Sequence, residues 1–148
     1  MCGIAGLIHK GKQSNVGDQM TSMLQALKHR GPDSTGYAVY NDGTQGDLVM
    51  RIKVAEAEDM NRGSGIYEEL EKRISLVDKV LVKHKVEVVD KTKVTEYALR
   101  YVVRHSGELR SLANQLEEIS GTEILSIGEG LELIKDLGDA QELSLIHI

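Results

Sequence analysis

The sequence predicts an α+β protein, because two kinds of hydrophobic pattern alternate along the chain. Apolar residues at helical spacing give way repeatedly to short stretches rich in Val, Ile and Tyr. From Leu48 to Ile127 the expected elements follow the order strand, helix, strand, strand, helix, strand. That order is typical of a split-βαβ, ferredoxin-like unit, so we expect an inserted α+β subdomain at residues 55–136 after an N-terminal part at residues 1–54.

The N-terminal part should begin with three elements. Residues 2–9 are apolar and contain two glycines, which predicts a buried strand with Cys2 at its exposed tip. Apolar residues recur at the helical period over residues 16–27, with Asn15 as the expected N-cap. The only proline of the chain cannot continue a helix, so residues 30–34 are expected to form a turn.

The next two strands are expected at residues 36–40 and 48–54. Asn41-Asp42-Gly43 lies between them, and an Asp-Gly pair between two strands is a signal for a tight hairpin. The remaining expected elements are a helix over 66–81, strands over 85–89 and 95–104, a helix over 107–119 and a strand over 123–127.

Composition narrows the class of protein. The 148 residues suit a single domain, and the absence of Phe and Trp requires an aliphatic core. No apolar run approaches the roughly 18 residues of a membrane span, and the opening lacks a signal peptide, so we expect a cytoplasmic protein without a membrane partner. A net charge of −5 with few aromatic residues argues against a nucleic-acid partner. Scattered histidines, a single cysteine and no complete nucleotide-binding motif predict no metal and no cofactor.

The single cysteine is the second residue of the chain. Removal of Met1 would place its thiol on the residue that carries the free α-amino group. An α-amino group has a pKa of about 7.7 to 8.0, so it can act as the general base for that thiol. Cys2 therefore has the makeup of an N-terminal nucleophile, although a lone cysteine is more often a small buried apolar residue.

A second segment gives the cysteine a context. Cys2-Gly3-Ile4 is followed, after one predicted helix, by Arg30-Gly31-Pro32-Asp33-Ser34-Thr35-Gly36. Over residues 1 to about 40 the chain resembles the class II glutamine amidotransferases of the N-terminal-nucleophile hydrolase superfamily, in particular glutamate-synthase-type amidotransferase domains. In that family the same two motifs occur in the same order around a helix.

The resemblance implies both a fold and an activity. The fold would be a partial αββα-type sandwich, interrupted by the inserted subdomain. The activity would be attack of Cys2 on the side-chain amide of L-glutamine, with the ammonia passed to a synthase subunit or domain. Arg30 and Gly31 would lie beside the nucleophile in the wall of the glutamine pocket, without taking part in the chemistry. His29 is expected to be a structural histidine.

The chain also departs from the family pattern. A complete site of this family draws on a His-Thr-Arg segment, an Asn-Gly pair and a later Asp, and none of these is present. Every histidine is followed by Lys, Arg, Ser or Ile, and no asparagine is followed by glycine. Loss of one oxyanion donor costs about 10² to 10³ in rate, so we expect the isolated chain to be inactive.

The C-terminal residues suggest why those motifs are missing. Residues 143–148, Leu-Ser-Leu-Ile-His-Ile, look like a translated transposon adapter, and such scars do not belong to the native fold. On this interpretation residues 137–148 are a truncated tail. The alternative is a natural, short, apolar C-terminal strand.

Two other functions stay open at this point. The complete protein could be a related N-terminal-nucleophile amidohydrolase that acts on a different amide. It could also be a non-catalytic binding or assembly module, in which Cys2 is incidental and the inserted subdomain contacts a partner.

Overall fold

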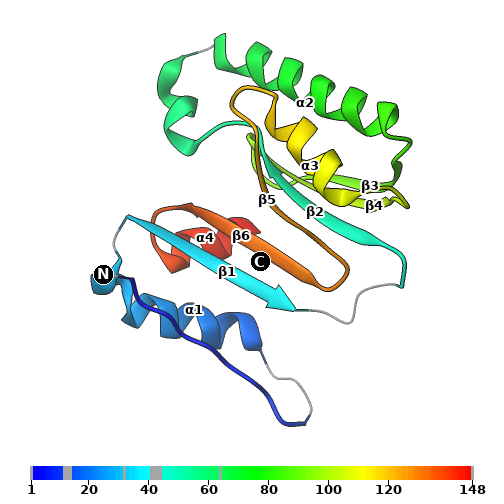
Figure 1. The fold of residues 1–148 in the computed structure, drawn as a ribbon. Coiled ribbons are helices and arrows are strands. Elements are labelled where there is room, and N and C mark those ends of the chain that lie inside the picture. Colours follow the sequence, from blue (N-terminus) through cyan, green and yellow to red (C-terminus); the bar gives the residue numbers. More distant parts are fainter. Residues whose placement is uncertain (1, 12–14, 32, 41–44, 64, 148) are drawn as a thin grey trace. The chain divides into compact units, whose positions relative to one another are not determined.

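A computed structural model describes residues 2–11, 15–31, 33–40, 45–63 and 65–147 (Figure 1). The chain divides into two compact units. The terminal unit combines Met1–Tyr37 with Lys135–Ile148, and the central unit is Ala38–Ile134. The central unit therefore interrupts the terminal unit in the sequence.

The central unit is built on a four-stranded antiparallel sheet with the order β3-β4-β2-β5. Along the chain its elements are β2, α2, β3, β4, α3 and β5, which confirms the predicted order of strands and helices. Their bounds are β2 (Leu48–Lys53), α2 (Gly65–Lys83), β3 (Glu87–Lys93), β4 (Ala98–Arg104), α3 (Leu109–Glu117) and β5 (Glu123–Gly128), with a 3-10 turn η2 (Ala57–Arg62) before α2.

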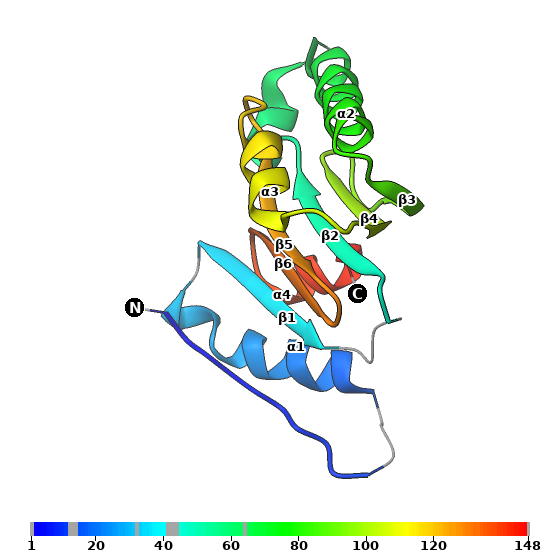
Figure 2. The same cartoon turned by 45° about the vertical axis from the view of Figure 1, so that its right-hand side comes forward.

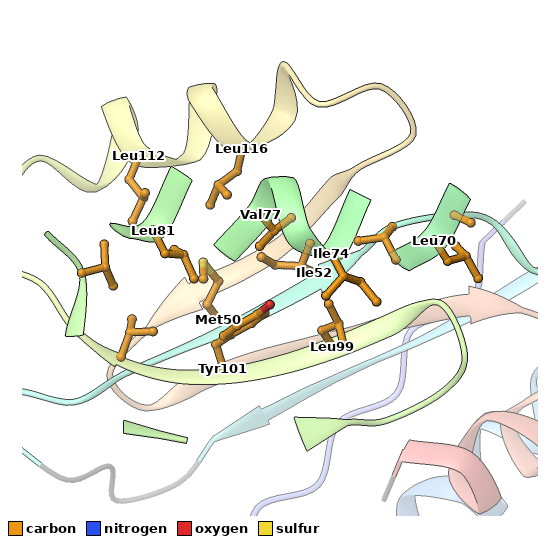
Figure 3. Close-up of a cluster of buried hydrophobic side chains, with 14 of the residues drawn as sticks. Met50, Ile52, Leu70, Ile74, Val77, Leu81, Leu99, Tyr101, Leu112 and Leu116 are labelled. Carbon is orange, nitrogen blue, oxygen red and sulfur yellow. The ribbon is translucent and has the colours of Figure 1, made fainter. Parts of the chain in front are cut away.

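Both helices of the central unit pack on one face of its sheet (Figures 1 and 2). Figure 3 shows the aliphatic core between these layers, in which Met50 and Ile52 of β2 lie beside Tyr101 and Leu99 of β4. Those four residues are cross-strand partners, Met50 with Tyr101 and Ile52 with Leu99. The helices contribute Leu70, Ile74, Val77 and Leu81 from α2 and Leu112 and Leu116 from α3. The core is therefore mainly aliphatic, as predicted, but it also contains the fully buried ring of Tyr101, which corrects the expectation of a purely aliphatic core.

The hydroxyl of Tyr101 is a polar group in this core, and it has a hydrogen-bond partner. The side chain of Tyr101 is fully buried, and its hydroxyl donates a 2.9 Å hydrogen bond to Asp78 Oδ1 on α2. Lys91 of β3 pairs with the same carboxylate at 2.7 Å and lies 5.3 Å from the centre of the Tyr101 ring. Burial, and then the hydrogen bond to Asp78, raise the pKa of Tyr101 far above its ordinary value, so the phenol stays neutral. This contact joins α2 to the sheet.

The terminal unit contains α1 (Val16–Ala26), a 3-10 turn η1 (Lys28–Arg30) and α4 (Ala140–His147). Helices α1 and α4 pack against each other. Strands β1 (Ser34–Tyr40) and β6 (Leu131–Leu137) form a separate two-stranded sheet, and the division between the two units falls within these two strands.

A buried tyrosine ties these elements together. Tyr37 of β1 donates a 2.8 Å hydrogen bond to the carbonyl of Ala140, and its hydroxyl lies 3.1 Å from Thr21 Oγ1 on α1. Thr35 Oγ1 donates to the carbonyl of Gly138 at 3.0 Å, and Gln25 Nε2 donates to Asp139 at 3.0 Å. The turn between β6 and α4 is thus held by both β1 and α1.

The segment expected to be a tail is ordered in this structure. Residues 137–147 complete β6 and form α4. Asp139 Oδ1 accepts the backbone N–H groups of Gln141 and Glu142, and Glu142 accepts the N–H of Asp139, a reciprocal capping pattern. The alternative of a C-terminal strand is therefore wrong, because this cap starts a helix. An adapter origin for residues 143–148 stays a prediction, as do the domain boundaries at 54 and 136.

Two further expectations fail. The predicted hairpin between the strands at 36–40 and 48–54 is wrong, because β1 pairs with β6 whereas β2 is flanked on both edges by β4 and β5. The Asp-Gly turn itself lies outside the described residues. Asn15 does not cap α1 through its side chain, which instead donates to the Asp18 carboxylate.

None of the helices in the described ranges combines the length and the apolar character needed to cross a bilayer.

Candidate active site

The N-terminal segment carries the candidate nucleophile. Residues 2–9 form no strand, which corrects the expectation of a buried strand. Ile4 and Ile8 are 93% and 89% exposed, and Cys2 is exposed. The physical reason is that no described strand pairs with this segment, and an extended apolar stretch becomes a strand only where a neighbour supplies its hydrogen-bond partners.

Burial of the side chains still alternates along this segment, as it does in an extended chain. Ala5, Leu7 and His9 are partly buried, whereas the residues between them are exposed. His9 Nε2 lies 2.9 Å from Gln19 Oε1 on α1, and in Figure 1 the segment runs alongside that helix. One side of the segment therefore rests on α1, and the other side faces solvent.

Glycine 3 brings the start of the chain to the predicted turn. A Cβ atom placed on Gly3 would lie 3.2 Å from Leu27 Cβ and 3.3 Å from Arg30 Cβ. The backbone next to Cys2 is thus in close contact with η1, which ends at Arg30. The structure brings together the two segments that carry the sequence motifs, although they are about 28 residues apart in the chain.

The turn itself is held by backbone hydrogen bonds. The N–H of Leu27 donates to the carbonyl of Leu24 at 2.9 Å, that of Arg30 to Leu27 at 2.8 Å, and that of Gly31 to Lys28 at 3.2 Å. Arg30 is exposed and Gly31 is partly buried, so the guanidinium is free to meet solvent or a ligand. Pro32 lies outside the described residues. Beyond it, the carbonyl of Asp33 accepts the N–H of Gly138 at 3.4 Å.

His29 is exposed within η1. Its expected role as a structural histidine stays a prediction. Among the side chains that the structure describes, no group of three or more His, Cys, Asp or Glu is arranged to hold a metal ion.

Comparison with known proteins adds to this geometry. Residues 1–62 match a glutamine amidotransferase domain. The match to this domain begins at the first residue and contains both motifs, Cys2-Gly3-Ile4 and the turn that starts at Arg30. It ends at the 3-10 turn η2, before α2 begins.

Three curated relatives carry related names. A candidate glutamine amidotransferase of Methanothermobacter thermautotrophicus is 31% identical over 147 residues, which is 97% of this chain and 46% of that protein. The glutamine amidotransferase-like protein GlxB of Rhizobium meliloti is 38% identical over 60 residues, which is 39% of this chain and 20% of that protein. A candidate glutamine-hydrolysing asparagine synthetase of Methanocaldococcus jannaschii is 46% identical over 41 residues, which is 28% of this chain and 8% of that protein.

The chain spans about half, or less, of the length of these relatives. The first of them is matched along nearly the whole chain, so its similarity includes the central unit as well as the N-terminal motifs.

Sequence reasoning missed the partners of Gly3. The two glycines of residues 2–9 signalled that some backbone or side chain comes close, but a sequence pattern does not say which one. Leu27 and Arg30 become visible as partners only when the segment is seen against α1 and η1.

Proposed function

We propose that the complete protein is a class II glutamine amidotransferase with Cys2 as its N-terminal nucleophile. The observation that carries the proposal is the domain match, which starts at residue 1 and includes both the cysteine motif and the Arg30 turn. The relative in M. thermautotrophicus extends the similarity over 97% of this chain.

The chemistry follows from having the thiol and the amine on one residue. After removal of Met1, the α-amino group takes the thiol proton and the Cys2 thiolate attacks the side-chain carbonyl carbon of glutamine. The amine then passes that proton to the leaving nitrogen, so ammonia departs and a γ-glutamyl thioester remains. Water hydrolyses the thioester to glutamate and restores the thiol.

The geometry supports a shared site for the two motifs. Gly3 contacts Leu27 and Arg30, so Cys2 starts beside the turn that would form part of the glutamine pocket. In this proposal Arg30 and Gly31 line the pocket as neighbours of the nucleophile, and Arg30 is exposed at the turn.

The fold proposal is a partial αββα-type sandwich with an inserted ferredoxin-like subdomain. The strand order β3-β4-β2-β5 supports the split-βαβ assignment, and the sequence position of the central unit between the two parts of the terminal unit supports an insertion. The exposed side of residues 2–9 fits a segment that would pair as a strand within a larger sheet.

We further propose that ammonia passes to a synthase subunit or domain. One relative has a name that joins glutamine hydrolysis to a synthetase, and this supports the same division of labour here. The isolated chain should be inactive, because it contains neither His-Thr-Arg nor Asn-Gly and so lacks the expected clamp and oxyanion donors.

Glutamine hydrolysis by the complete protein and by its Cys2→Ala variant tests this proposal. Wild type should release ammonia and glutamate, and Cys2→Ala should lose at least about 10³-fold in kcat, because no other residue is assigned the attack. Thermal unfolding of both proteins is the control for folding, since an exposed side chain adds little to stability.

The same assay separates the competing functions. Strong preference for glutamine over other amides supports an amidotransferase, whereas equal or better turnover of a different amide would point to a related amidohydrolase. A wild-type protein that retains Met1 by intact mass and hydrolyses no amide would favour a non-catalytic binding module.

A further inference from the structure

The contact made by Gly3 is tighter than the ordinary contacts of a Cβ atom. Carbon atoms that are not bonded prefer a separation of about 3.5 to 4.0 Å. A Cβ on residue 3 would lie 3.2 Å from Leu27 Cβ, 3.3 Å from Arg30 Cβ and 3.5 Å from Leu27 Cδ1. Two of these three atoms are Cβ atoms, which cannot turn away by changing a rotamer. Any side chain at residue 3 therefore requires a shift of the backbone on one side of the contact.

The two sides of the contact are not equally free to shift. Leu27, Arg30 and Gly31 are held by consecutive backbone hydrogen bonds of 2.9, 2.8 and 3.2 Å that continue from α1. The N-terminal segment is held by no strand ladder in the described structure, and its exposed side is open. The displacement therefore falls on the N-terminal segment, which carries Cys2 one residue away.

We infer that Gly3 is a positioning residue that sets the Cys2 thiol against the Arg30 turn by packing its bare backbone on Leu27 and Arg30. This inference rests on the proposed function and adds a role for a residue that does not touch the substrate. Relieving the close contact needs a shift of a few tenths of an ångström, and a misplacement of about 1 Å can cost about 10² in rate. We expect a side chain at residue 3 to lower kcat about tenfold.

Gly3→Ala in the complete protein is the test, and Gly6→Ala is its matched control. Both substitutions add one methyl group to the same segment, but a Cβ on Gly6 meets nothing within 4 Å. Gly3→Ala should lower kcat for glutamine about tenfold, with KM within about twofold, because the pocket wall at the turn stays in place. Gly6→Ala should leave both constants within about twofold of wild type.

Alkylation of Cys2 distinguishes a misplaced thiol from a general structural defect. A small reagent such as iodoacetamide needs only the thiol and its neighbouring amine, so both variants should react with it at the wild-type rate and with the same pH profile. If Gly3→Ala matches Gly6→Ala in kcat, the inference is overturned. It is also overturned if kcat, KM, alkylation and the thermal midpoint all change together, because that pattern marks a structural defect.

A crosslink tests the contact without any assay of activity. In a Cys2→Ala background, Gly3→Cys with Arg30→Cys should form a disulfide under mild oxidation, since the two Cβ atoms would be close to the disulfide range of about 3.5 to 4.5 Å. Gly6→Cys with Arg30→Cys should not. Failure of the first pair overturns the inference. A crosslink together with a wild-type protein that hydrolyses no glutamine overturns the proposed function, and with it the positioning role.

Discussion

At the scale of single residues, the central unit holds a buried carboxylate between two arginines. Glu132 has only 7% of its side chain exposed, and it accepts from Arg51 of β2 at 2.8 Å and from Arg100 of β4 at 3.0 Å. Burial alone would raise the pKa of Glu132, but the hydrogen bonds from Arg100 and Arg51 outweigh it and hold that pKa below the ordinary value. The carboxylate stays ionised and links β2 to β4 across the sheet.

This arrangement predicts a pH-dependent contribution to stability. Since the pKa of Glu132 is lower in the folded than in the unfolded protein, the contribution is present above about pH 4.3 and disappears as the pH falls further. Glu132→Gln should lower the free energy of unfolding at pH 7 by about 2 kcal/mol or more, because two partly buried guanidinium groups lose their counter-charge.

Chemical denaturation of both proteins at pH 7, pH 4 and pH 3 checks this. The difference in the free energy of unfolding between wild type and Glu132→Gln should become smaller as the pH falls, because the Glu132 carboxylate of wild type also becomes neutral. A difference that stays constant from pH 7 to pH 3 would show that the carboxylate charge does not contribute to folding.

At the scale of elements, the hydrophobic pattern predicted α2 and α3 well, because each presents one apolar stripe to the sheet. The stripe on α2 runs from Ile66 through Ile74 to Leu81, as its spacing indicates. Strand pairing was harder to predict, since an Asp-Gly turn suggests a local hairpin but cannot reveal that both edges of β2 are already occupied. The cap of α4 was visible as Asp139-Ala140-Gln141-Glu142, but residues 137–148 were interpreted as a tail.

A pair of valines on α2 tests the packing of that helix. Val77 is fully buried and Val82 is 75% exposed. Val77→Ala should lower the free energy of unfolding by about 2 kcal/mol, from two lost methyl groups at about 0.8 kcal/mol each and a small cavity. Val82→Ala should change it by less than about 0.5 kcal/mol. Equal effects of the two changes, measured by urea unfolding, would mean that α2 does not face the sheet as described.

At the scale of the whole molecule, the central unit has a core of its own. Its buried cluster consists of residues of β2, α2, β4 and α3 and their connections, from Leu48 to Leu116, with Ile124 and Ile127 of β5 packed against it. A unit with its own aliphatic core and a complete antiparallel sheet can fold alone. The order of its elements was predictable from the sequence, because the spacing of apolar residues in each element is typical of either a helix or a strand.

A fragment of residues 38–134 tests that independence. It should unfold cooperatively in urea and retain the helical signal of α2 and α3 in circular dichroism, because every side chain of the buried cluster is included. A fragment with no cooperative transition would mean that the central unit depends on the terminal unit for its fold.

The candidate site was predictable only in part at this scale. Cys2, Arg30 and Gly31 were named from their motifs, because each lies in a short run of residues that can be recognised in the sequence. The contact between the motifs through Gly3 was not predictable, since it depends on the path of the chain after α1.

The central claim is that Cys2 is an N-terminal nucleophile for glutamine. The most direct measurement is intact-mass analysis and peptide mapping of the complete protein after treatment with a glutamine analogue that has an electrophilic carbon in place of the side-chain amide. The account predicts loss of Met1 and a single adduct on the tryptic peptide of residues 2–10, at Cys2, with excess glutamine slowing the reaction. A protein that retains Met1, or that reacts at another residue, would contradict it.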